Sequence, residues 1–108
     1  MNQYALSKMA ALVKEWAINK PLIQKIEFFG SRVKGTERPD SDLDIAIELV
    51  PNCDESNGLA TWLHCKDIWE KELQEILPVK VQIEWNGGEN TEIIAKGLRE
   101  ERYLVYEN

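Results

Sequence analysis

The sequence has few of the residues that hold small proteins together through disulfides or a metal. Its 108 residues include only two cysteines and one histidine. Cys53 and Cys65 lack the close paired spacing of a zinc site, and two cysteines make no disulfide framework. We therefore expect two reduced cysteines in a cytoplasmic protein.

Long apolar runs and an excess of basic charge are missing as well. No apolar stretch approaches the roughly 20 residues that span a bilayer, and the segment 1–4 lacks the basic start of a signal peptide. The chain carries 19 acidic and 13 basic residues, a net charge of −6, which argues against a broad surface for DNA or RNA. We expect no membrane association and no direct nucleic-acid binding.

What the sequence does have is enough apolar side chains for a core. Hydrophobic residues make up 44% of the chain, which is too many for a disordered protein. The length fits one domain over residues 1–108, with no internal repeat and no low-complexity tract. We expect no second domain that could grip a large substrate.

Apolar periodicity in the first half predicts a helix followed by two strands. Residues 5–19 repeat apolar side chains every three or four positions, namely Ala5, Leu6, Met9, Leu12, Val13, Trp16 and Ala17. Residues 22–29 are rich in β-forming side chains and predict a strand, and the loop at 31–41 begins with a segment that can form a helical turn. Residues 42–49 alternate, which predicts a strand with one buried face, with Leu43, Ile45, Ile47 and Leu49 on one side and Asp42, Asp44, Ala46 and Glu48 on the other.

The second half predicts a long helix and further strands. We expect a loop over 51–58 and a helix over 59–77, whose apolar stripe is Leu59, Trp62, Leu63, Trp69, Leu73 and Ile76. Charges four residues apart, Lys66 and Glu70 among them, indicate a solvated face of that helix. Residues 79–85 alternate as a strand, 90–98 look helical, and 103–106 can add a short edge strand. The predicted fold class is α/β (α+β), a small mixed sheet of three to four strands flanked by helices.

The most informative stretch is Gly30-Ser31, ten further residues, and then Asp42-Leu43-Asp44. Gly30 ends a strand and permits a tight turn with close backbone approach to a ligand. Ser31 begins the next turn, where backbone N–H groups and a hydroxyl can hold phosphate oxygens. Asp42 and Asp44 are two positions apart on a strand, so their side chains share a face.

Two carboxylates on one face repel each other unless a proton or a cation lies between them. Carboxylate and phosphate oxygens together are the ligands that Mg²⁺ prefers. The same loop carries Arg32, Lys34 and Arg38, a local cationic cluster that suits a triphosphate rather than a polymer.

Two other interpretations fit parts of this stretch. Polar residues alternating with apolar ones are what any edge strand shows, so the two aspartates alone are a weak signal. Gly30 and Gly35 have the spacing of a P-loop, but Thr36 stands where that motif requires lysine. The combination of strand, Gly-Ser, cationic turn and Asp-x-Asp distinguishes the stretch from both.

That combination resembles the signature of the nucleotidyltransferase superfamily that includes DNA polymerase β. The stretches 28–35 and 39–46 resemble its smallest members, the minimal nucleotidyltransferases of the MNT or MntA antitoxin type. The resemblance implies the nucleotidyltransferase fold and covers nearly the whole chain. It also implies two Mg²⁺ ions held by Asp42 and Asp44, and ATP or another nucleoside triphosphate held by Gly30, Ser31, Arg32, Lys34 and Ser41.

The implied reaction is attack of an acceptor hydroxyl on the α-phosphate, with loss of pyrophosphate. The family usually supplies a third carboxylate from the next strand. Here the corresponding position is Gln82, which cannot act as a base or as a charged ligand. Glu84 shares its face and can take over that catalytic role if the strand pairs in a shifted register; otherwise it is an ordinary exposed glutamate.

The resemblance also implies a partner. Minimal members commonly pair with a small helical protein of the HEPN type, a ribonuclease-like toxin, so this chain is expected to be a hetero-oligomeric antitoxin that adenylylates it. The alternative is a catalytically impaired binding module that neutralises the toxin by binding alone, as Gln82 would suggest. A weaker third interpretation is nucleotidyl transfer to an aminoglycoside or a polynucleotide.

Overall fold

A computed structural model describes residues 3–35, 42–50, 55–85 and 102–108. The first part contains helix α1 (Gln3–Ile18), strand β1 (Ile23–Phe29), the single helical turn α2 (Ser31–Lys34) and strand β2 (Leu43–Leu49). The second part contains helix α3 (Glu55–Ile76) and strands β3 (Val81–Trp85) and β4 (Arg102–Glu107). These bounds confirm the predicted order of elements within the described part of the chain.

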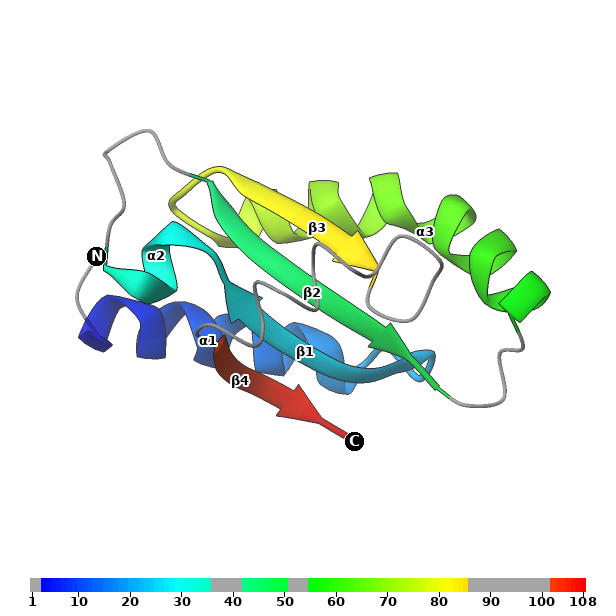
Figure 1. The fold of residues 1–108 in the computed structure, drawn as a ribbon, viewed down its shortest axis with the longest axis horizontal. Helices are drawn as coiled ribbons and strands as arrows, with labels where there is room; N and C mark the ends of the chain where they lie inside the picture. Colours follow the sequence, from blue (N-terminus) through cyan, green and yellow to red (C-terminus); the bar gives the residue numbers. More distant parts are fainter. Residues whose placement is uncertain (1–2, 36–41, 51–54, 86–101) are drawn as a thin grey trace.

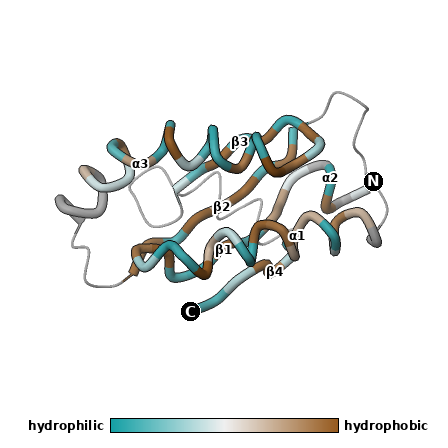
Figure 2. The backbone as a smooth tube through the Cα atoms, turned by 180° about the vertical axis from the view of Figure 1, so that it is seen from behind, coloured by the Kyte–Doolittle hydropathy of each residue, from teal (hydrophilic) through white to brown (hydrophobic). Residues whose placement is uncertain are grey.

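The four strands form one mixed sheet in the order β3-β2-β1-β4. β1 runs antiparallel to both β2 and β4, whereas β2 and β3 are parallel. Both long helices lie on the same face of this sheet (Figure 1), and the view from behind shows α1 and α3 in front of the strands (Figure 2). The expectation of a small mixed sheet with helices is therefore confirmed.

The core lies between this sheet face and the two helices. The register places Phe28 of β1 opposite Ile45 of β2, and Ile26 opposite Ile47, so the apolar sets of both strands face the helices. All four side chains are completely buried. This packing supplies the main stabilisation of the fold, since each such side chain contributes about 1.5–3 kcal/mol when removed from water.

Tryptophan side chains connect the two helices with the sheet. Trp69 of α3 meets Trp16 of α1 edge-on at a centroid distance of 6.1 Å, and it meets Trp62 at 6.3 Å. Trp62 in turn stacks on Trp85 of β3 at 6.5 Å. The aromatic row runs through the helix side of the sheet, so these rings have a packing role.

Several details of the predicted elements are wrong. α3 begins at Glu55, inside the segment expected to be a loop, and Leu63 and Ile76 of its expected apolar stripe are 66% and 38% exposed. Leu12 of α1 is also exposed, at 42%. Only part of each expected stripe is covered, and the buried positions of α3 include Trp62, Trp69 and Leu73. The expected helix at 90–98 lies outside the described residues.

The other face of the sheet, which we call the polar face, carries Glu27, Phe29, Asp44, Ala46, Glu48, Gln82 and Glu84. Ala46, expected on an exposed side, is in fact only 2% exposed, and Phe29 packs against it. Glu27 is 3% exposed and forms ion pairs with Lys25 at 3.2 Å and Arg102 at 3.4 Å. These partners offset the cost of burying its charge.

The two cysteines were expected to be reduced. Cys65 is a half-buried free thiol on α3, and burial raises its pKa. Cys53 lies outside the described residues. None of the described helices is long and apolar enough to cross a membrane.

Candidate functional site

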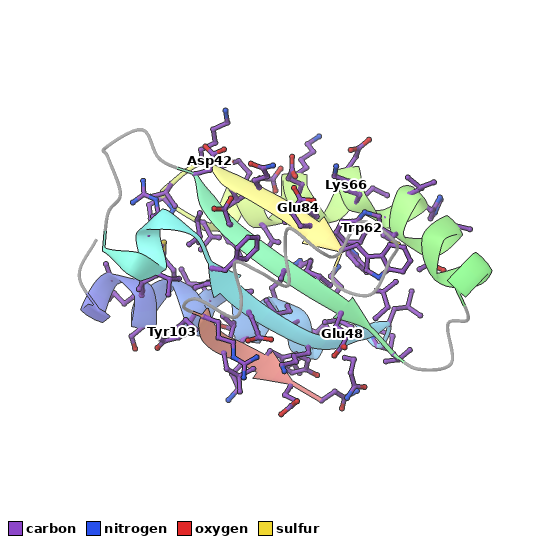
Figure 3. The ribbon with its side chains drawn as sticks, viewed as in Figure 1. Asp42, Glu48, Trp62, Lys66, Glu84 and Tyr103 are labelled. Carbon is purple, nitrogen blue, oxygen red and sulfur yellow. The ribbon has the colours of Figure 1, made fainter. Side chains whose placement is uncertain are left out.

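Asp42 and Asp44 lie at the start of β2, at the end of the sheet near α2. Asp42 directly precedes the strand, and Asp44 is opposite Phe29 of β1 on one side and Gln82 of β3 on the other. Figure 3 shows Asp42 at this end, Glu84 on the neighbouring strand and Glu48 near the far end of β2. The alternation of the strand gives the two aspartates the same face, about 6.6 Å apart along the backbone.

Gly30 brings the turn between β1 and α2 against the Asp44 carboxylate. Its φ of +85° lies in the left-handed region that glycine tolerates best. A methyl group at this position would overlap Oδ2 of Asp44 and lie 3.1 Å from its Cγ. The structure thus requires glycine at position 30 for two reasons: its backbone conformation, and the space that the Asp44 carboxylate occupies.

The Asp44 carboxyl is held in an environment that disfavours its charge. Partial burial, together with the negative charges of Asp42 and Glu84, raises its pKa from 3.8 to about 6. Burial is the largest of these causes, and the two neighbouring carboxylates add to it. A raised carboxyl pKa in a group of acidic side chains is typical of functional sites.

The stability of the free protein should reflect this pKa. Because folding favours the protonated form of Asp44, its contribution to the free energy of unfolding is greatest below about pH 3.8 and is lost as the pH rises through about 6. Asp44→Asn removes the charge, so the variant should match the wild type at pH 4 and become the more stable protein above pH 6. Thermal unfolding in chelator across this range measures the difference, and a difference that does not change with pH would contradict the assignment.

The residues present fit Mg²⁺ bound together with a nucleotide. In the described residues no three side chains of histidine, cysteine, aspartate or glutamate form a group that could hold a metal by themselves. Mg²⁺ is usually held by one or two carboxylates with substrate phosphates completing its shell. Asp42 and Asp44 provide two carboxylates, and the charge repulsion that raises the pKa of Asp44 is what a cation would relieve.

The predicted nucleotide-binding residues are only partly placed by the structure. Ser31 begins α2 directly after Gly30, as expected, and Lys34 ends it. Arg32 is 6% exposed and therefore buried, and its contact with a nucleotide stays a prediction. Ser41 lies outside the described residues, as does Arg38.

β3 brings Gln82 and Glu84 to the same face as the aspartates. The strand pairs so that Gln82 is opposite Asp44 and Glu84 is opposite Ala46, which means that the shifted register considered for Glu84 does not occur. Glu84 nevertheless lies close enough to raise the pKa of Asp44. Its Oε1 accepts a hydrogen bond of 3.0 Å from Nε2 of Gln82.

Two side chains to which the sequence interpretation gave no role at the site contact β3 from α3. Glu70 and Gln74 hydrogen-bond to the backbone of β3 and of the turn before it. The charge pattern had indicated a solvated helix face at Glu70. The sequence could not reveal this contact of Glu70. A glutamate that accepts a hydrogen bond from a backbone N–H of a neighbouring strand can occupy the same helical position as one that faces solvent.

Comparison with known proteins agrees with this geometry. A model of the family "Polymerase beta, Nucleotidyltransferase" matches residues 12–108. The chain belongs to this nucleotidyltransferase family. No curated protein matches it.

Solved structures share the fold. A chain of a toxin–antitoxin crystallised with AMP-PNP is 20% identical, with a TM-score of 0.56, and the match covers 100% of this chain and 75% of that one. Two mutants of the MntA–HpeT toxin–antitoxin also match over 100% of this chain. One, with two aspartates replaced by glutamate, is 18% identical with a TM-score of 0.55 and 75% of its chain covered. The other, with a tyrosine replaced by alanine, is 21% identical with a TM-score of 0.60 and 74% covered.

Proposed function

We propose that this chain is a Mg²⁺-dependent nucleotidyltransferase that moves AMP from ATP to a hydroxyl on a partner protein. The observation that carries the proposal is the contact between the Asp44 carboxylate and Gly30, which directly precedes the first turn of α2. The carboxylate that we propose as a metal ligand thus lies beside backbone N–H groups that can hold phosphate oxygens. Membership in the nucleotidyltransferase family supports the reaction type.

The chain's own residues would perform three tasks in this reaction. Gly30 and Ser31 hold the β- and γ-phosphates at the start of α2, while Asp42 and Asp44 hold Mg²⁺ against the triphosphate. When bound, Mg²⁺ supplies charge neutralisation on the phosphate oxygens. The acceptor oxygen forms a bond to the α-phosphorus as the bond to the pyrophosphate oxygen breaks, and Glu84 accepts the hydroxyl proton.

We further propose that the partner is a toxin of the HEPN type and that this chain is its antitoxin. The support is that structures with the same fold are toxin–antitoxins, one of them crystallised with AMP-PNP. In one of these mutants the two replaced aspartates are two positions apart, which is the spacing of Asp42 and Asp44. An acceptor hydroxyl on the partner would approach Asp44 and Glu84 from the polar face.

A second candidate function is neutralisation by binding alone. Gln82 lies directly opposite Asp44, where the family usually has a carboxylate, and an amide cannot accept a proton from the acceptor hydroxyl. In this case the chain would still bind ATP and its partner but would not turn ATP over. The Asp42 and Asp44 carboxylates would then contribute to nucleotide affinity only.

The two functions are separated by labelling with ATP that carries ³²P at the α-phosphate. The chain is incubated with Mg²⁺ and the protein encoded next to it, and the products are separated on a denaturing gel. We expect label on the neighbouring protein, and none when both Asp42 and Asp44 are replaced by asparagine. A stable complex that stays unlabelled with the wild-type chain would favour the binding module.

A further inference from the structure

Among the strands that the structure describes, β3 lies at one edge of the sheet, so half of its backbone groups point away from β2. On the inner side the carbonyl of Lys80 accepts a hydrogen bond of 2.8 Å from the N–H of Leu43 in β2. Because successive backbone groups of a strand alternate in direction, the N–H groups of Val81 and Ile83 lie on the outer edge. Such an edge is open to slippage or to pairing with another chain unless it is blocked.

Side chains of α3 occupy this outer edge. Oε1 of Gln74 accepts a hydrogen bond of 3.0 Å from the N–H of Val81, and its Nε2 donates one of 2.8 Å to the carbonyl of Val79. The Gln74 side-chain amide thus makes one accepting and one donating hydrogen bond with the backbone at the start of β3, as a peptide group of a neighbouring strand would. Oε2 of Glu70 accepts a hydrogen bond of 3.3 Å from the N–H of Ile83.

The spacing of the two residues matches the strand. Four residues of a helix rise about 6 Å, and two residues of a strand advance about 6.6 Å. Glu70 and Gln74 can therefore reach two successive outward N–H groups of β3, with Glu70 at Ile83 and Gln74 at Val81. The earlier helix residue contacts the later strand residue, so α3 and β3 run in opposite directions along this contact.

The hydrogen bonds from Glu70 and Gln74 hold the part of β3 that carries Glu84. Ile83 lies between Gln82 and Glu84, whose side chains both point to the polar face. A slip of one residue would turn Glu84 to the helix side, away from Asp44. Holding the Ile83 and Val81 N–H groups in place therefore adds to the pairing with β2 in keeping Glu84 on the polar face.

We propose that Glu70 and Gln74 are positioning residues that hold β3 from its outer edge and so keep Glu84 beside Asp44. The catalytic part of this inference rests on the proposed nucleotidyl transfer, whereas the hold on β3 does not. The sequence places both residues one helical turn apart on α3, far along the chain from the Gly-Ser and Asp-x-Asp motif.

The first part of the test is amide hydrogen exchange at Val81 and Ile83. In Glu70→Ala the Ile83 amide should exchange about tenfold faster, and in Gln74→Ala the Val81 amide should do so, as expected for the loss of one hydrogen bond. Glu70→Gln keeps an acceptor oxygen and should restore protection. Glu75→Ala, which removes an exposed carboxylate next to Gln74, is the matched control and should change neither amide.

The second part compares transfer rates with and without Glu84. Glu70→Ala/Gln74→Ala should lower kcat about tenfold and leave the KM for ATP within about twofold, because the phosphate-binding turn is untouched. In the Glu84→Gln background the same pair of changes should cause no further loss. Equal losses in both backgrounds, or unchanged exchange at Val81 and Ile83, would overturn the inference.

The two parts also separate failure of this inference from failure of the proposed function. If the wild-type chain transfers no nucleotide, the proposed function and the catalytic role of Glu70 and Gln74 are both refuted. The exchange rates then still decide whether α3 holds β3. If the wild type is active and the exchange rates do not change, only the inference fails.

Discussion

Asp44→Asn is expected to remove the Mg²⁺ dependence of ATP binding. The variant keeps the size of the side chain but loses the charge that would attract a cation beside Gly30. ATP binding in Mg²⁺ should weaken about a hundredfold, a loss typical of an altered metal site, while binding in chelator should stay within a few fold. Calorimetric titration of each protein with ATP in both buffers gives the four affinities.

The control for this experiment is Glu48→Gln, at the other end of β2. It also removes a carboxylate from the polar face and so makes the same change in net charge. We expect its affinities to equal those of the wild type in both buffers. Equal weakening of Asp44→Asn with and without Mg²⁺ would show that Asp44 has a structural role instead.

Gly30→Ala is expected to affect both stability and the site. A non-glycine residue at its φ of +85° costs on the order of 1–3 kcal/mol, and the new methyl group would also displace the Asp44 carboxylate. We therefore expect a lower melting temperature together with at least about a tenfold loss of Mg²⁺-dependent ATP binding.

Gly35→Ala is a matched control because it introduces the same backbone strain as Gly30→Ala but no overlap with the Asp44 carboxylate. Gly35 has a φ of +79°, and a methyl group there would meet nothing within 4 Å among the described atoms. This variant should lose comparable stability but keep the affinity for Mg²⁺-ATP. If both variants lose ATP binding equally, the contact between Gly30 and Asp44 does not matter to the site.

The sequence predicted the sheet from short local patterns. The alternation from Leu43 to Leu49 defines a strand and the direction of its side chains, and the β-forming residues before Gly30 predict the strand beside it. Pairing the two strands in register was enough to bring Asp44 next to Gly30. This central part of the candidate site could therefore be predicted from local pattern and the Gly-Ser signature.

The sequence could not predict which apolar side chains of each helix are buried against the sheet. Leu63 and Leu73 are equally apolar, but only Leu73 lies against the sheet, because the tilt of α3 depends on all of its contacts together. Ala46 was placed on an exposed side by alternation, yet it is buried on the polar face next to Phe29. Patterns assign a side chain to a face, and tertiary packing decides whether that face is covered.

The register of β3 also required three-dimensional information. Gln82 and Glu84 share a face in any register that keeps the apolar side buried, so the sequence left open which one lies opposite Asp44. The structure places Gln82 there and Glu84 one step further along. Side chains of α3 contribute to this register, and no local pattern in β3 contains that contact.

The most direct test of the account follows which phosphate of ATP reaches the partner protein. Parallel reactions use ATP with ³²P at the α-phosphate and ATP with ³²P at the γ-phosphate, each with Mg²⁺, the wild-type chain and the neighbouring protein. Nucleotidyl transfer predicts label on the protein from the α-phosphate alone, with release of labelled pyrophosphate from the γ-labelled ATP. Label from the γ-phosphate would show phosphoryl transfer and would contradict the account.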